Sequence, residues 1–279
     1  MKEFGQQPDS ILAGKILREH PNGFCGCIVE GQRAIGKTAY CLRVSKQVYQ
    51  RLDKTLSDYD AYMKALENCL FDIDDVLRVL KQTRKKREVI PCIVWDDAGA
   101  FASSLLWFTD LEAVTQLKSV MDTIRTAVTG FIINCPDRGS LLRNLRNYDD
   151  YIVEIVKDEG GNGKNNVSKE TGQPYKNYQR VARGYTSFKL PSGKRIIHKN
   201  FEDAFSCYIP VDVYHKYMEK RHLYLDKAVD IMEETKKQRL SSKTRKKKAD
   251  TIYDIDLKKK FEDYKEKGLI EDEEKKDEP

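Results

Sequence analysis

The chain has 279 residues, of which 40% are hydrophobic and 34% charged, with a formal net charge of +6. This is enough for one large α/β domain with extensions, and the mild basic excess does not by itself indicate nucleic-acid binding. No apolar run approaches the roughly 18 residues of a membrane span, and the N-terminus lacks the apolar core of a signal peptide. We therefore expect a cytoplasmic protein with no membrane span. The seven cysteines form no metal-binding pattern and are expected to be buried free thiols.

The first predicted elements lead into a glycine-rich loop. Residues 1–25 should hold an N-terminal helix, over 9–19, and a linker. Cys27–Glu30 is typical of a buried strand, and apolar residues at helical spacing follow residue 38. Between them, GQRAIGKT at 31–38 matches G-x-x-x-x-G-K-[ST], the P-loop whose backbone N–H groups wrap nucleotide phosphates.

The residue types of this loop predict a nucleotide site. Glycines 31 and 36 permit backbone angles and close phosphate approach that a Cβ would block. Lys37 offers a positive charge to the β- and γ-phosphates, and the Thr38 hydroxyl is a ligand for Mg²⁺. The predicted nucleotide-binding residues are Gly31, Gln32, Arg33, Ala34, Ile35, Gly36, Lys37, Thr38 and Ala39.

Helical and strand patterns alternate over the next hundred residues. Residues 57–82 keep helical spacing with a break near Phe71, and 89–95 form a continuous apolar run typical of a buried strand. A capping-box signature at 109–112 predicts a helix to about Ala127, ended by Gly130. A further buried strand is expected over 131–134.

Polar residues that end two of these strands complete the predicted site. Asp96 and Asp97 follow the strand at 89–95, in the form of a Walker B element. We expect Asp96 and Thr38 to converge from adjacent strand ends upon one Mg²⁺. Asp97 stands where a water-orienting Glu is common and is one methylene shorter. Asn134, at the end of the next strand, is expected to reach the γ-phosphate or the water, although a turn-forming Asn is the alternative.

The region 26–157 forms the predicted ATPase core. Arg143 and Arg146 precede a strand at 151–156 and are candidates for a finger that acts in trans, although surface arginines are nearly as plausible. Strands alternating with helices predict a P-loop NTPase fold of the α/β class, in three α/β/α layers around a mostly parallel sheet.

The remaining third of the chain differs in character. Residues 158–210 should form a β-rich extension, with a polar loop at 158–174 and antiparallel segments at 175–190 and 195–199. A C-terminal helix is expected over 211–238 and a charged, disordered tail over 239–279. The candidate DNA contacts are the basic runs 84–87 and 236–248, and Tyr175, Lys176, Tyr178, Arg180, Arg183 and Tyr185, for which a half-buried hairpin is the alternative.

The chain resembles the additional-strand class of P-loop ATPases, which includes AAA+ and RecA-like proteins. Within that class it looks like the DnaA-like ATPases of crenarchaeal viruses and plasmids. The likeness covers roughly residues 10–225 and is carried by GQRAIGKT at 31–38, IVWDDAGA at 93–100, TIRT at 123–126, LLRNLRNYDDYIVEI at 141–155 and IPVDVYHKYMEKRHLY at 209–224. One departure is the β-rich segment after residue 157, where AAA+ proteins have a helical lid, so no lid arginine can be assigned.

These patterns lead to an expected function and to alternatives. The expected function is a Mg²⁺-dependent ATP hydrolase that acts on DNA for a mobile element or its host, in replication initiation, helicase loading, partition or packaging. We expect it to form a homo-oligomer and to have a helicase or another replication protein as a partner. A nucleotide-gated scaffold with slow hydrolysis and a P-loop kinase are the alternatives. A GTPase is disfavoured because no N-K-x-D element follows the D-x-x-G at 96–99.

Overall fold

The computed structural model describes residues 9–98, 115, 117–119, 121–142, 145–147, 150–157, 179–189, 195–227, 229–230 and 259. The chain divides into two compact units, Met1–Arg221 and His222–Pro279. The first unit contains the predicted nucleotide site and every strand in the part of the chain that the structure describes.

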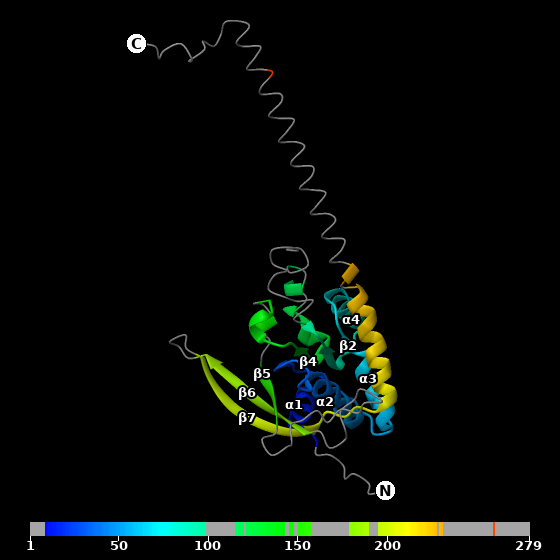
Figure 1. Cartoon of the computed structure of the whole chain (residues 1–279), viewed down its shortest axis with the longest axis vertical. Helices are drawn as coiled ribbons and strands as arrows, with labels where there is room; N and C mark the ends of the chain where they lie inside the picture. Colours follow the sequence, from blue (N-terminus) through cyan, green and yellow to red (C-terminus); the bar gives the residue numbers. More distant parts are fainter. Residues whose placement is uncertain are drawn as a thin grey trace, which may run out of the picture. The chain divides into compact units, whose positions relative to one another are not determined.

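A seven-stranded mixed sheet forms the centre of this unit, in the order β2-β3-β4-β1-β5-β6-β7. Figure 1 shows β6 and β7 as the long pair of strands beside β5. The first five strands in this order run parallel, and β6 and β7 add to the β5 edge in antiparallel fashion. The predicted α/β fold, with a mostly parallel sheet and an antiparallel extension, is thereby confirmed. The strands are β1 (Cys25–Glu30), β2 (Cys69–Leu70), β3 (Ile90–Trp95), β4 (Val128–Asn134), β5 (Tyr151–Lys157), β6 (Gln179–Lys189) and β7 (Arg195–Ser206).

Side-chain caps set the starts of three helices. Ser10, Ser57 and Asp72 each accept a hydrogen bond from a backbone N–H of the first turn, which satisfies a group that has no partner within the helix. The helices are α1 (Ile11–Glu19), α2 (Lys37–Leu52), α3 (Asp58–Glu67) and α4 (Ile73–Lys86), with 3₁₀ turns η1 (Ile124–Thr126), η2 (Arg138–Ser140) and η3 (Leu145–Asn147). A further helix covers 211–227 and is called the C-terminal helix below.

Helices cover both faces of the sheet. Side chains of β1, β3 and β4 that point to one face, among them Trp95 and Phe131, join the apolar face of α4 in one buried cluster. The opposite face carries α1 and α2, where a Cβ on Gly130 would lie 3.1 Å from Ile16 Cδ1. This alternation follows the period of two along each strand and produces the three predicted layers.

The strand order corrects one detail of the predicted site. β4 lies between β1, which precedes the P-loop, and β3, which precedes the acidic pair, so these two strands are not adjacent. The inserted strand agrees with the resemblance to the additional-strand class. It also means that three parallel strands end at the same edge of the sheet, with Asn134 of β4 between the other two.

Two predicted boundaries were wrong. The helix expected to reach Ala127 ends earlier, because Ile124–Thr126 form a 3₁₀ turn and Val128 already belongs to β4. Gly130 does not end a helix but lies inside β4, where its missing Cβ makes room for Ile16 of α1. The first part of that helix, residues 109–114, lies outside the described residues, as do the polar loop at 158–174 and most of 228–279.

Other predictions about this part of the chain hold. The helical region 57–82 is interrupted near Phe71, where the short strand β2 separates α3 from α4. All seven cysteines, each within the described residues, are buried free thiols. In the part of the chain that the structure describes, no helix is long and apolar enough to cross a membrane.

Candidate functional site

The P-loop connects β1 to α2 and depends on its two glycines. Gly31 has a φ of +147° and Gly36 a φ of +104°, values that L-residues rarely adopt. A Cβ on Gly31 would lie 3.0 Å from the carbonyl oxygen of Ile155 in β5, and one on Gly36 would overlap Cys207 Sγ. The glycines are therefore required by packing against β5 and against Cys207, which directly follows β7, as well as by the turn itself.

The Lys37 side chain folds back into this loop. Its ammonium donates hydrogen bonds of 2.8 Å to the carbonyl oxygens of Gly31 and Gln32, and the residue is only 9% exposed. Burial lowers the pKa of Lys37, because the charged form loses hydration. The loop thus holds a poorly hydrated cation that an anionic group could neutralise. Of the other predicted residues, Ile35 and Ala39 are buried, while Gln32, Arg33 and Ala34 are exposed.

The predicted partners Thr38 and Asp96 lie side by side. Asp96 immediately follows β3, is fully buried, and accepts a hydrogen bond of 3.2 Å from Thr38 Oγ1 through Oδ1. The same oxygen accepts bonds from the Asn134 amide and from the backbone N–H of Asp97. Burial, and then the negative charge of Asp97, raises the pKa of Asp96, although the hydrogen bonds oppose the shift.

Asn134 completes this cluster from the end of β4. Its amide nitrogen donates to Asp96 and, at 3.2 Å, to Thr38 Oγ1. Its carbonyl oxygen is buried and has no hydrogen-bond partner among the described residues. A buried acceptor without a donor is unfavourable, so this oxygen marks a place where a water or ligand group would be stabilised.

The donor set of this cluster fits Mg²⁺. The carboxylate of Asp96 is buried, and its Oδ1 accepts hydrogen bonds from uncharged groups. It lies beside the Thr38 hydroxyl and the Asn134 amide, whose oxygen has no partner in the part of the chain that the structure describes. Hard oxygen ligands of this kind suit Mg²⁺, which is commonly held by one or two protein groups together with phosphate and water. Thr38 and Asp96 are the residues that would hold it.

Only one of the two candidate finger arginines lies among the described residues. Arg143 lies outside the described residues. Arg146 lies in η3 and is half-buried, and its Nε has no hydrogen-bond partner among the described residues. The role of either arginine in trans remains a prediction.

Two side chains that the sequence reasoning did not single out bind the acidic pair. Tyr217 of the C-terminal helix donates a 2.8 Å hydrogen bond to Asp96 Oδ2, and Arg221 forms an ion pair of 2.8 Å with Asp97 Oδ2. Asp97 itself has a φ of +50°, which is uncommon for a residue other than glycine. The signals in the sequence were the i, i+4 spacing of the two side chains and their place in the segment 209–224, which carries part of the resemblance.

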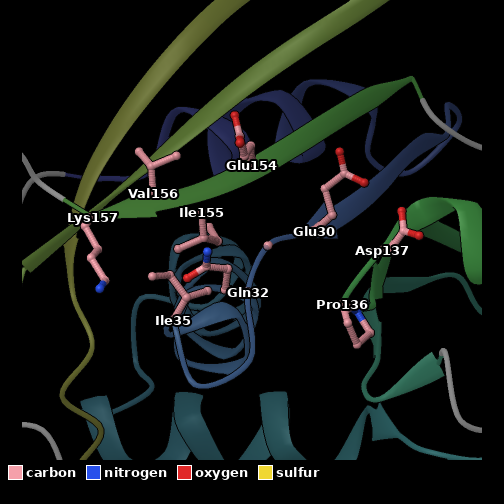
Figure 2. A pocket seen from close by; sticks show the side chains of 10 residues that line it. Glu30, Gln32, Ile35, Pro136, Asp137, Glu154, Ile155, Val156 and Lys157 are labelled. Carbon is pink, nitrogen blue, oxygen red and sulfur yellow. The ribbon is translucent and has the colours of Figure 1, made fainter.

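An open cavity of about 590 Å³ adjoins the P-loop on the β5 side (Figure 2). Its walls include Gln32 and Ile35 of the loop, and three carboxylates from separate elements, Glu30, Asp137 and Glu154, surround it. Lys157 also lines the cavity, but the three carboxylates outnumber this one cation and therefore disfavour phosphate groups there.

The predicted DNA contacts are only partly described. Residues 84–87, at the end of α4, are exposed. Arg180 is 4% exposed and therefore cannot contact DNA in this conformation, which corrects that part of the prediction. Arg183 and Tyr185 lie half-buried on β6, while residues 175–178 and 236–248 lie outside the described residues.

Comparison with known proteins gives relatives from viruses. Protein B-251 of Sulfolobus spindle-shape virus 1 is 29% identical over 224 residues, which cover 80% of this chain and 84% of that protein. Protein ORF286 of Acidianus two-tailed virus is 28% identical over 149 residues, 53% of this chain and 49% of that protein. No family model matches the chain.

Solved structures overlap with the chain only loosely. The N-terminal domain of zonular occludens toxin from Neisseria meningitidis overlaps with 64% of this chain and 95% of its own length, with 10% identity and a TM-score of 0.35. An overlap with so low a TM-score indicates neither a shared ligand nor a shared activity. Functional reasoning about this chain therefore rests on the geometry of its own site.

Proposed function

We propose that this chain binds ATP with Mg²⁺ at the P-loop and hydrolyses it. The observation that supports this most is the meeting of Thr38, Asp96 and Asn134, which come from α2, the end of β3 and the end of β4. Burying a carboxylate without a cation is costly, and packing alone gives no reason to place one there. A bound divalent cation would remove this cost.

Each residue of the site has a proposed role. Lys37 would exchange its two carbonyl partners for phosphate oxygens, and Thr38 and Asp96 would hold Mg²⁺. When bound, Mg²⁺ neutralises charge that develops between the β- and γ-phosphates. Asp97 would orient the attacking water, and the free carbonyl oxygen of Asn134 would accept a hydrogen bond from that water or from one bound to the metal.

We further propose that hydrolysis serves a DNA-processing step in a homo-oligomer, as in the DnaA-like ATPases that the sequence resembles, with a helicase or another replication protein as a partner. The described surface offers one basic region that supports DNA binding. Arg78, Lys81, Arg84 and Lys85 are all exposed on α4, and Lys86 and Arg87 extend this group at its end. Such a surface suits a phosphate backbone, and its binding should weaken steeply with salt.

A hydrolysis assay tests the enzymatic part of the proposal. Wild-type protein should release phosphate from ATP only with Mg²⁺, Lys37→Ala should lose nucleotide binding, and Asp97→Asn should bind nucleotide without turnover. Lys54→Ala, a change of an exposed lysine just beyond the C-terminal end of α2, is the control for loss of one charge. A preference for GTP over ATP would support a GTPase. Transfer of phosphate to a metabolite would support a kinase, and nucleotide binding with negligible turnover would support a scaffold.

The same assay with added DNA tests the DNA part. We expect single- or double-stranded DNA to stimulate hydrolysis, and Lys81→Glu with Lys85→Glu to remove the stimulation while basal turnover is kept. Lys54→Glu is the matched charge reversal. If Arg146 acts in trans, mixing Arg146→Ala with Lys37→Ala protein should restore some hydrolysis, and proven mixed oligomers without recovery would exclude that role.

A further inference from the structure

The C-terminal helix contacts both acids of the candidate site through one oxygen of each. The Tyr217 hydroxyl donates to Asp96 Oδ2 at 2.8 Å. The Arg221 guanidinium donates to Asp97 Oδ2 through Nε at 2.9 Å and through Nη2 at 2.8 Å. The bonds from Thr38 and Asn134 instead reach Oδ1 of Asp96, so the two oxygens of this carboxylate face different elements.

Contacts with α3 fix the position of this helix (Figure 1). Lys216 Nζ donates to the Tyr59 hydroxyl at 2.9 Å, and Lys220 Nζ donates to the carbonyl oxygen of Leu66 at 2.9 Å. The second contact places a cation at the C-terminus of α3, where the helix dipole favours positive charge. Tyr217 also packs against Phe71, with ring centroids 6.0 Å apart.

An anchored donor on Oδ2 determines where Oδ1 points. The terminal torsion of an aspartate has a broad, roughly two-fold preference, so a carboxylate bonded at one oxygen alone can turn. Tyr217 holds Oδ2 of Asp96 toward the C-terminal helix, and this leaves Oδ1 toward Thr38, where the cation would bind. Arg221 holds Asp97 differently, because two guanidinium nitrogens grip the one oxygen Oδ2, and this ion pair is about one-third exposed at both side chains.

We propose that Tyr217 and Arg221 are positioning residues of the nucleotide site, which orient Asp96 toward Mg²⁺ and Asp97 toward the attacking water. This inference rests on the proposed function. It makes the C-terminal helix part of the site, although the helix begins more than a hundred residues after the acidic pair. It also separates the two roles, because Tyr217 acts on the cation ligand and Arg221 on the residue that orients water.

The test of Tyr217 uses a matched tyrosine. Tyr217→Phe removes one hydroxyl, and Tyr40→Phe removes a hydroxyl that donates at the same 2.8 Å to another buried aspartate, Asp203. Binding of a fluorescent ATP analogue is followed by anisotropy as Mg²⁺ is varied. We expect Tyr217→Phe to raise the Mg²⁺ concentration for half-maximal binding by about tenfold, as for loss of one bond to a charged group. Tyr40→Phe should leave it unchanged.

The test of Arg221 separates turnover from binding. Arg221→Ala should lower kcat by about tenfold or more while KM changes by less than about twofold, the pattern of an interaction made in the transition state. Arg221→Lys should restore part of the loss. The control is Arg51→Ala, because Arg51 forms a similarly exposed ion pair with Asp9 outside the site.

The outcomes distinguish this inference from the proposed function. If the wild-type chain shows no Mg²⁺-dependent nucleotide binding, both are refuted. The inference alone is refuted if the wild-type chain binds and hydrolyses ATP but the variants behave like their controls. In that case Tyr217→Phe needs the same Mg²⁺ concentration for half-maximal binding as Tyr40→Phe, and Arg221→Ala has the same kcat as Arg51→Ala. Melting temperatures of all variants show whether a loss reflects unfolding, and Arg221→Lys gives a second reading if Arg221→Ala is unstable.

Discussion

Replacing Gly36 by alanine tests how closely the P-loop is packed against the rest of the domain. Gly36 has φ +104° and ψ 15°, and a residue with a Cβ in so sparsely populated a conformation costs about 1–3 kcal/mol. The new Cβ would also overlap Cys207 Sγ, and relief of such overpacking typically costs a further 1–3 kcal/mol or so. We therefore expect the free energy of unfolding to fall by about 2–6 kcal/mol.

Urea unfolding followed by circular dichroism measures this change. Gly14→Ala is the matched control, because Gly14 lies inside α1 and its new Cβ would make only an ordinary contact, 3.7 Å from Arg51 Nη1. This variant should be more stable than wild type by about 0.5–1 kcal/mol. In a Cys207→Ala background the overlap is absent, so adding Gly36→Ala to that variant should cost only the backbone part. A Gly36→Ala protein within about 0.5 kcal/mol of wild type would refute the reasoning.

Three further predictions concern buried polar groups. Asp96→Asn should raise the melting temperature of the nucleotide-free chain at pH 7, because burial raises the pKa of Asp96 and makes its charged form costly. The cost grows as the pH rises from the ordinary pKa of an aspartate toward that raised pKa, so the gain should shrink as the pH is lowered to about 4, and calorimetry at pH 7 and pH 4 checks this. Asp203→Ala should destabilise the chain by about 3 kcal/mol in urea, because Ser10, Ile11 and Tyr40 all donate to Asp203, whereas nucleotide binding should stay unchanged. Asn134→Ala should lower kcat by about 10–100-fold, measured by phosphate release, and an unchanged kcat would exclude Asn134 from the site's chemistry.

The parts of the site that could be predicted from the sequence are those formed by residues close together in the chain. The P-loop is a contiguous pattern of eight residues, and Asp96 follows a continuous apolar strand, so both could be recognised locally. The meeting of Thr38 with Asp96 followed from the rule that parallel strands end at one edge of a sheet, although β4 separates the two strands. The bonds of Tyr217 and Arg221 join residues more than a hundred positions apart, and no local pattern predicts such contacts.

Errors in the predicted fold have equally physical causes. Gly130 resembled a helix stop, but its role is to let α1 approach β4 closely, which depends on Ile16 far earlier in the chain. The strand β2 has two residues and is too short to show any periodicity. Arg180 was expected to be exposed because the alternation of side chains along β6 does not tell which of its two faces is buried. The structure shows that Arg180 lies on a buried face.

Calorimetric titration of the chain with ATP tests the central claim most directly. The account predicts one site per chain in Mg²⁺, much weaker binding in EDTA, and no binding by Lys37→Ala protein that keeps the wild-type melting temperature. Binding that persists unchanged in Lys37→Ala, or no binding by the wild-type chain in Mg²⁺, would contradict it.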